Sequence, residues 1–249
     1  SSFRLDKVFK KFFHQFASPK TFYFVSQKIF PYLFWLSIVS LIIGLIWGIL
    51  YAPVDKVQGN SYRIIYMHVP ASFAAQSLYM MIAVASFIFL IWKVKLAAYV
   101  VKSVSLIGAS VTFLALISGS IWGVPTWGTW WQWDARITST LILFIMYLGL
   151  ISLHNSFNNL DKADKFISVL ALVGFINIPI IKMSVNWWST LHQPASITLS
   201  SKPSIDLAML YPLMICIFSF LGLIIAIVLR AIQYEILLRE KNKKWIQSI

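Results

Sequence analysis

Six long apolar stretches dominate this chain of 249 residues. They lie at about residues 32–50, 70–92, 97–121, 136–153, 166–186 and 205–230. A helix needs roughly 20 apolar residues to cross a bilayer, whereas a membrane barrel shows short alternating segments that this sequence lacks. With 59% hydrophobic and 12% charged residues, the chain has too little polar surface for a soluble domain. We therefore predict an all-α integral membrane bundle of six transmembrane helices, with residues 1–249 forming a single domain.

The 21 lysines and arginines divide unevenly between the two sides that six spans define. Sixteen lie in the N-terminal segment, the second and fourth connections and the C-terminal tail, and five lie on the other side. Basic residues near span ends favour the cytoplasm, which predicts that both termini are cytoplasmic. The net charge of +13 then reflects topology and attraction to membrane lipid, and it does not indicate nucleic-acid binding.

Three further segments carry predictions. Residues 1–31 mix basic and phenylalanine residues, which is typical of an amphipathic cytoplasmic segment on the inner leaflet, and residues 231–249 form a cytoplasmic tail. In the fifth span, Asn177 and Pro179 predict a kinked, locally hydrogen-bonded helix. No G-x-x-x-x-G-K-[ST] motif is present, so energy from ATP must come from a partner.

Two histidines at the outward span boundaries share a local sequence. The motif H-x-P-A-S begins at His68 and again at His192. A proline suits the first turn of a helix and disfavours helix just before it, so we expect each histidine to lie just outside a helix start. Either one alone is compatible with a polar side chain tolerated at the interface. Two in the same context on one face favour a shared role.

Residues 122–138 read W-G-V-P-T-W-G-T-W-W-Q-W-D-A-R-I-T and hold five of the eleven tryptophans. If this periplasmic segment is helical, one face carries Trp127, Trp130, Trp131 and Asp134, and another carries Trp133 and Arg136. Such a segment would lie on the outer leaflet and offer indole faces to a large planar apolar ligand. The alternative is an aromatic belt that anchors the bundle.

Haem meets the requirements of this outward face. Its iron accepts two imidazoles, here His68 and His192, and its propionates suit the guanidinium of Arg136 or Arg63. Arg63 and Arg136 are alternatively headgroup anchors. A zinc site needs three or four ligands and leaves the tryptophans, Trp122 included, without a purpose. Asp134 either caps the loop, or it orients an imidazole or pairs with Arg136.

The stretch W-G-T-W-W-Q-W-D-A-R-I-T at 127–138, with the flanking histidines and the six-span layout, resembles the tryptophan-rich (WWD) haem-handling family that includes CcmC, CcmF and CcsA. The resemblance is closest to the haem exporter protein C branch of bacterial cytochrome c maturation, and it covers essentially the whole chain. It implies a haem transport protein rather than an enzyme, facing the periplasm from the bacterial inner membrane.

The resemblance also implies a cargo and partners. Haem b would be held non-covalently, in transit, by His68 and His192 as axial ligands against the tryptophan-rich segment. A periplasmic haem chaperone of the CcmE type would receive it. An ABC-type ATPase and its membrane subunit (CcmA, CcmB) and a small single-span subunit (CcmD) would act beside the chain. A part in promoting covalent haem attachment to the chaperone stays open.

Two other classes of function stay open as well. A b-type electron-transfer cytochrome also uses paired histidines, although it usually places both within spanning helices. A transporter of amphipathic substrates would use the tryptophans for acyl chains and bind no haem. An absorption spectrum of the protein separates these classes.

Overall fold

The structure is a computed structural model that describes residues 17–188, 192 and 205–249. It holds six helices that are long and apolar enough to cross a membrane, which confirms the predicted helical bundle. These spans are Pro19–Tyr51, Asn60–Trp92, Lys95–Trp127, Ala135–Asn155, Leu160–Trp187 and Leu207–Arg239.

Several spans are built from more than one helix. The elements are α2 (Pro19–Ile46) continued by the π-helical η1 (Trp47–Tyr51), the 3-10 turn η2 (Asn60–Ile64) leading into α3 (Ile65–Trp92), α4 (Lys95–Trp127), α5 (Ala135–Asn155), α6 (Leu160–Gly174), α7 (Asn177–Trp187), α8 (Leu207–Arg239) and the short α9 (Lys244–Gln247).

The outer helices are longer than the apolar stretches predict. Helix α2 begins at Pro19 rather than near residue 32, and α8 continues to Arg239 rather than ending near residue 230. Long basic side chains keep their charge in water while their stems cover apolar surface, so hydropathy alone underestimates such ends. Residues 1–16 of the predicted surface segment lie outside the described residues.

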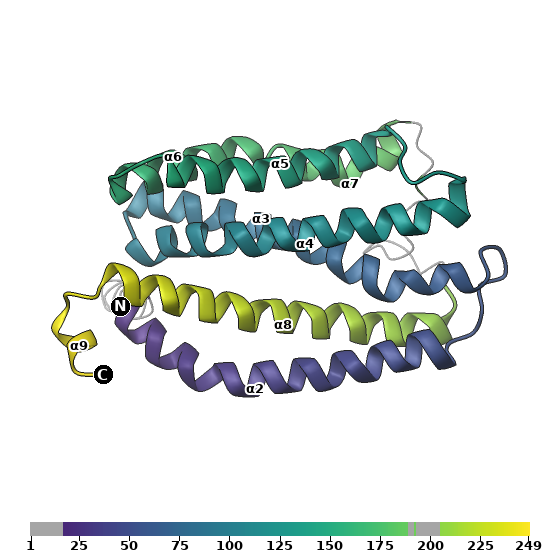
Figure 1. Cartoon of the computed structure of the whole chain (residues 1–249), viewed down its shortest axis with the longest axis horizontal. Coiled ribbons are helices and arrows are strands. Elements are labelled where there is room, and N and C mark those ends of the chain that lie inside the picture. The colour runs from purple at the N-terminus through teal and green to yellow at the C-terminus, as the bar shows by residue number, and fades with distance from the viewer. Residues whose placement is uncertain (1–16, 189–191, 193–204) are drawn as a thin grey trace, which may run out of the picture.

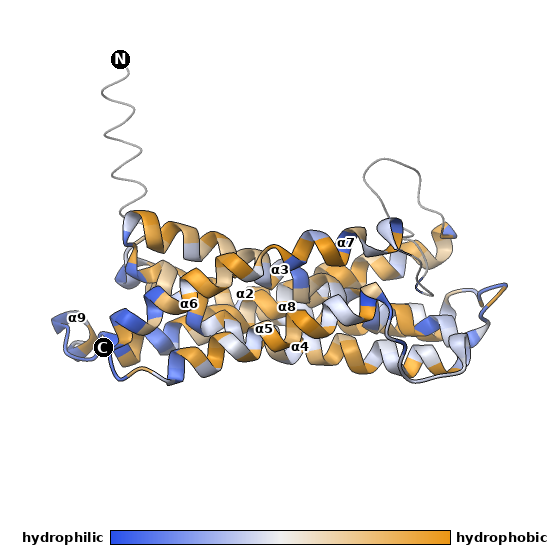
Figure 2. Ribbon diagram, turned by 90° about the horizontal axis from the view of Figure 1, so that it is seen from above, coloured by the Kyte–Doolittle hydropathy of each residue, from blue (hydrophilic) through white to orange (hydrophobic). Residues whose placement is uncertain are grey.

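The helices form two groups along one common direction (Figure 1). Helices α2 and α8 pack against each other, and α3 to α7 form the second group, in which α3 and α4 lie between α8 and the helices α5 to α7. The start of α2 and the end of α8 lie together at what we call the terminal end. The opposite end, called the site end, holds the start of α3, the end of α4 and the start of α5. Hydrophobic residues follow the helices and hydrophilic ones gather towards the ends (Figure 2).

The fifth span breaks near its middle, as Asn177 and Pro179 predict. Helix α6 ends at Gly174 and α7 begins at Asn177. The Asn177 side-chain amide donates to the Ser139 carbonyl of α5 at 2.9 Å. The side chain therefore ties the broken span to a neighbouring helix, because polar groups inside a membrane must find protein partners.

Charged side chains gather at the terminal end, in what we call the ion cluster. Arg239 of α8 donates to both carboxylate oxygens of Asp164 on α6, at 2.5 and 3.0 Å, and also pairs with Glu235. Glu235 in turn accepts a hydrogen bond from the Lys102 ammonium of α4 at 2.8 Å. His154 of α5 also belongs to the cluster, with its Nε2 3.2 Å from Arg239 Nη2. The cluster therefore joins α8 to three helices of the other group.

Candidate functional site

His68 lies inside α3, which corrects the expectation that it precedes a helix start. The 3-10 turn η2 runs directly into α3, so helical backbone begins at Ile65, five residues before Pro70. A proline within a membrane helix is tolerated where neighbouring groups satisfy the freed carbonyl. The motif therefore places His68 on a rigid helix at the site end.

The His68 ring is fixed by residues one helical turn apart on α4. Its Nδ1 lies 3.0 Å from Ser118 Oγ, and its ring packs edge-on against Trp122 with centroids 5.6 Å apart. A Cβ at Gly119 would come within 3.0 Å of His68 Cε1. The glycine thus allows the imidazole to lie directly against the α4 backbone.

The hydrogen bonds of Ser118 select the tautomer of His68. The Ser118 hydroxyl donates to the carbonyls of Leu114 and Ala115, at 2.8 and 3.1 Å. Its oxygen is therefore left to accept from His68, which places the ring proton on Nδ1. The lone pair then lies on Nε2, whose contact with Ser72 Oγ is long, at 3.4 Å. A neutral imidazole in this state is a metal ligand through Nε2, with Ser118 orienting the ring.

Trp122 links His68 to the first connection. Its indole N–H donates to Gln58 Oε1 at 2.7 Å, and its ring lies 5.8 Å from that of Tyr62. Trp122 is therefore a packed wall beside His68 rather than part of an exposed platform.

His192 lies in the α7–α8 connection and contacts the end of α4. Its ring centroid is 6.2 Å from that of Trp127, the last residue of the helix. Trp122, which packs against His68, lies near the same end of α4 as Trp127. The structure thus brings the two predicted ligands to the same end of the bundle. The rest of the second motif, residues 193–196, lies outside the described residues.

The tryptophan-rich segment does not form the helix that we considered. Helix α4 continues to Trp127 and ends at Gly128, whose φ of +76° is the left-handed conformation that suits glycine. Residues 128–134 are irregular, and α5 starts after Asp134. The shared faces expected from helical spacing are therefore wrong, and residues 122–127 belong to a spanning helix.

Asp134 caps α5. Its Oδ1 accepts from the Ile137 backbone N–H at 2.8 Å, which confirms the capping interpretation. Its charge also acts on Arg136, which is half-buried two residues later. The carboxylate therefore stabilises the N-terminus of the helix that carries Arg136.

Two tryptophans of the segment are open to the surroundings. Trp130 and Trp133 are 63% and 74% exposed, and Trp133 packs edge-on against Trp131 at 5.4 Å. Trp131 and Trp130 cover an apolar groove of about 330 Å³ between α4 and α5. Within the described chain the buried Trp131 indole N–H has no hydrogen-bond partner. A buried donor of this kind suits a polar ligand group or a water.

Arg63 is held by the protein itself. Its Nη1 donates to the Gly48 carbonyl at 2.8 Å and its Nε to Asn60 Oδ1 at 3.1 Å. The bond to Gly48 ties the 3-10 turn η2 to the π-helical end of the first span. Arg136 is therefore the better candidate for pairing with a ligand carboxylate.

Sequence reasoning missed Ser118, Gly119 and Gln58. The sequence does hold a sign of Ser118 and Gly119: they lie four and three residues before Trp122, so helical spacing places them on the same face of α4. For Gln58 no local signal exists, because its partner is 64 residues away. No group of three or more His, Cys, Asp or Glu side chains suited to a metal forms within residues 17–188, 192 and 205–249.

Comparison with known proteins gives a consistent result. The family model "Heme exporter protein C" (CcmC) matches residues 12–247. Heme exporter protein C of Haemophilus influenzae is 42% identical over 239 residues, covering 96% of this chain and 97% of the relative. The protein of that name from Escherichia coli K12 is 45% identical, with 96% of each covered. That from Bradyrhizobium diazoefficiens is 43% identical over 90% of this chain and 84% of its own. The chain therefore belongs to the heme exporter protein C family.

Proposed function

We propose that this multi-pass membrane protein holds haem b in transit at its site end, with His68 and His192 as axial ligands, for delivery in c-type cytochrome biogenesis. One observation carries the proposal. The Ser118 hydroxyl fixes the Nδ1 proton of His68, so the ring presents the lone pair of Nε2 to a metal, at the same end of the bundle as His192. The relatives are named as exporters of heme, and haem iron takes two imidazoles.

Other residues of the site suit the remaining parts of haem. Arg136 offers a half-buried guanidinium for a propionate, and carboxylates pair well with that group. Trp127, against His192, offers an apolar face for the macrocycle. A bis-histidine electron-transfer cytochrome fits less well, because His192 comes from a connection and not from a spanning helix.

We place the site end on the periplasmic face of a bacterial inner membrane, because the basic residues gather at the other end of the spans. Exposed Trp130 and Trp133 then face the periplasm, where a CcmE-type chaperone would dock and receive haem. CcmA, CcmB and CcmD are the expected membrane and ATPase partners. The chain itself acts as a carrier, and its affinity for haem must be low enough for the chaperone to take the haem from it.

The absorption spectrum of the purified full chain from haem-replete cells tests the ligands. We expect a Soret band that is lost or shifted in His68→Gly and in His192→Gly, since each change removes one axial nitrogen. Added imidazole should restore the band by occupying the vacated position. His154→Gln, in the ion cluster at the opposite end, is the matched control and should keep the wild-type band. A wild-type spectrum in both glycine variants would show that the ligand assignment is wrong.

Haem transfer to the chaperone tests the docking surface. Trp130→Ala and Trp133→Ala should slow transfer to a purified CcmE-type chaperone while leaving the Soret band of the carrier intact, because both rings are exposed and neither packs on His68. Trp35→Ala, exposed on α2, is the control. Unchanged transfer rates in both site-end variants would rule out this surface as the docking site.

A further inference from the structure

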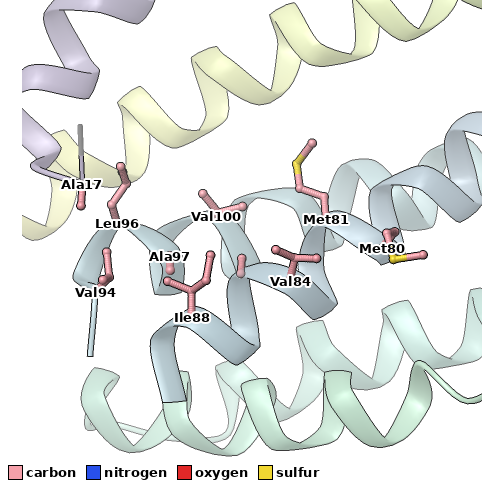
Figure 3. A pocket seen from close by; sticks show the side chains of 10 residues that line it. Ala17, Met80, Met81, Val84, Ile88, Val94, Leu96, Ala97 and Val100 are labelled. Atoms are coloured by element: carbon pink, nitrogen blue, oxygen red, sulfur yellow. The ribbon is translucent and has the colours of Figure 1, made fainter. Parts of the chain in front are cut away.

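An apolar groove lies at the terminal end, away from the haem site. It has a volume of about 460 Å³, within the range of small-ligand sites. Helix α3 forms one wall with Met80, Val84 and Ile88, and the start of α4 forms another (Figure 3). Ala17, just before α2, closes the end near Leu96.

The direction of the groove suits an extended hydrocarbon chain. Met80, Val84 and Ile88 are spaced by four residues, so they lie on one face of α3. The distance from Met80 to Ile88 is about 12 Å at 1.5 Å per residue. A groove that follows a spanning helix runs parallel to the acyl chains of the bilayer. Met80 and Val84 are 43% and 52% exposed, so the groove opens to the side of the bundle.

Positive charge stands at the mouth of the groove. Val94 lines the groove; its neighbours in the chain are Lys93, which follows α3, and Lys95, which begins α4. The Lys93 ammonium lies 5.7 Å from the centre of the Phe89 ring. Both lysines are exposed, and neither forms an ion pair within the described part of the chain. The backbone of Lys93 is left-handed, with φ of 55°, which ends α3 and turns the chain at this point.

We propose that this groove binds one acyl chain of an anionic phospholipid whose phosphate is held by Lys93 and Lys95. The apolar walls would exclude a free anion, and the paired lysines select against a zwitterionic headgroup. Basic residues beside spanning helices attract anionic lipids in this way. The bound lipid would fill the space between α3, α4 and the start of α2, because α2 packs mainly on α8 and makes little contact with α3.

Native mass spectrometry of the full chain in detergent, with added phosphatidylglycerol or phosphatidylcholine, tests the site. We expect the wild type to retain phosphatidylglycerol in preference, and the Lys93→Gln/Lys95→Gln variant to lose that preference by several-fold. Val84→Trp should reduce retention of both lipids, because the indole fills the groove. Lys162→Gln/Lys165→Gln is the matched control, since it removes two exposed lysines from the start of α6 at the same end.

Three results would overturn the proposal. The first is equal phosphatidylglycerol retention in the two double variants, which would make the binding a general charge effect. The second is wild-type retention in Val84→Trp, which would place the lipid elsewhere. The third is competition by inorganic phosphate alone, which would show an anion site without an acyl chain. Each variant must also be shown to be folded. Because Cys216 is buried, a folded variant should react with a maleimide dye only when it is heated.

Discussion

Replacing Arg239 by Leu is expected to destabilise the bundle by about 3–5 kcal/mol, because it removes the guanidinium that pairs with two buried carboxylates. The Arg239 and Asp164 side chains are 8% and 4% exposed, and Glu235 is 5% exposed. Asp164 would lose both hydrogen bonds to the guanidinium, while Glu235 would keep only Lys102. The effect should be large because the cluster joins α8 to helices of the other group.

Thermal unfolding in detergent measures this effect directly. The chain has one cysteine, Cys216, and it is buried, so its reaction with a maleimide dye on heating reports unfolding. Arg230→Leu is the matched control: Arg230 lies on the same helix but is exposed, and its pairing partners are Gln233 and the Phe30 ring. Exposed charges contribute little to stability. Equal unfolding temperatures for the two variants would contradict a structural role for the ion cluster.

The number and type of spans could be predicted from the sequence because each follows from about 20 consecutive apolar residues. The break at Asn177 was predictable for a similar local reason, since an amide and a proline interrupt one apolar stretch. Helix ends such as Pro19 and Arg239 were not, because hydropathy falls at basic residues although the backbone stays helical.

The ion cluster and the surroundings of His68 could not be predicted, because they depend on pairs far apart in the chain. Arg239 and Asp164 are separated by 75 residues, and His68 and Ser118 by 50. The irregular form of residues 128–134, in contrast, has local signals. Gly128 ends α4 and Asp134 caps α5, and both residue types are typical of those positions.

Gly108→Ala is expected to destabilise the bundle by about 1–3 kcal/mol, because α4 approaches Tyr147 too closely for any side chain. A Cβ at Gly108 would lie 2.1 Å from Tyr147 Cε1. The tyrosine cannot move aside, because its hydroxyl donates to the Ala75 carbonyl at 2.7 Å and its ring packs edge-on against Tyr79 at 5.3 Å. Tyr147 and Tyr79 are both fully buried. The substitution therefore forces α4 and α5 apart.

Gly149→Ala provides a control of opposite sign in the same assay. Gly149 is also helical, but the nearest atom to its Cβ position is 3.9 Å away, on Leu170. Alanine there should stabilise α5 by up to about 1 kcal/mol, since glycine is the poorer helix former. In a Tyr147→Leu background, Gly108→Ala should cost much less, because the clashing ring is gone. If Gly108→Ala and Gly149→Ala shift the unfolding temperature alike, the close α4–α5 contact at Tyr147 does not exist.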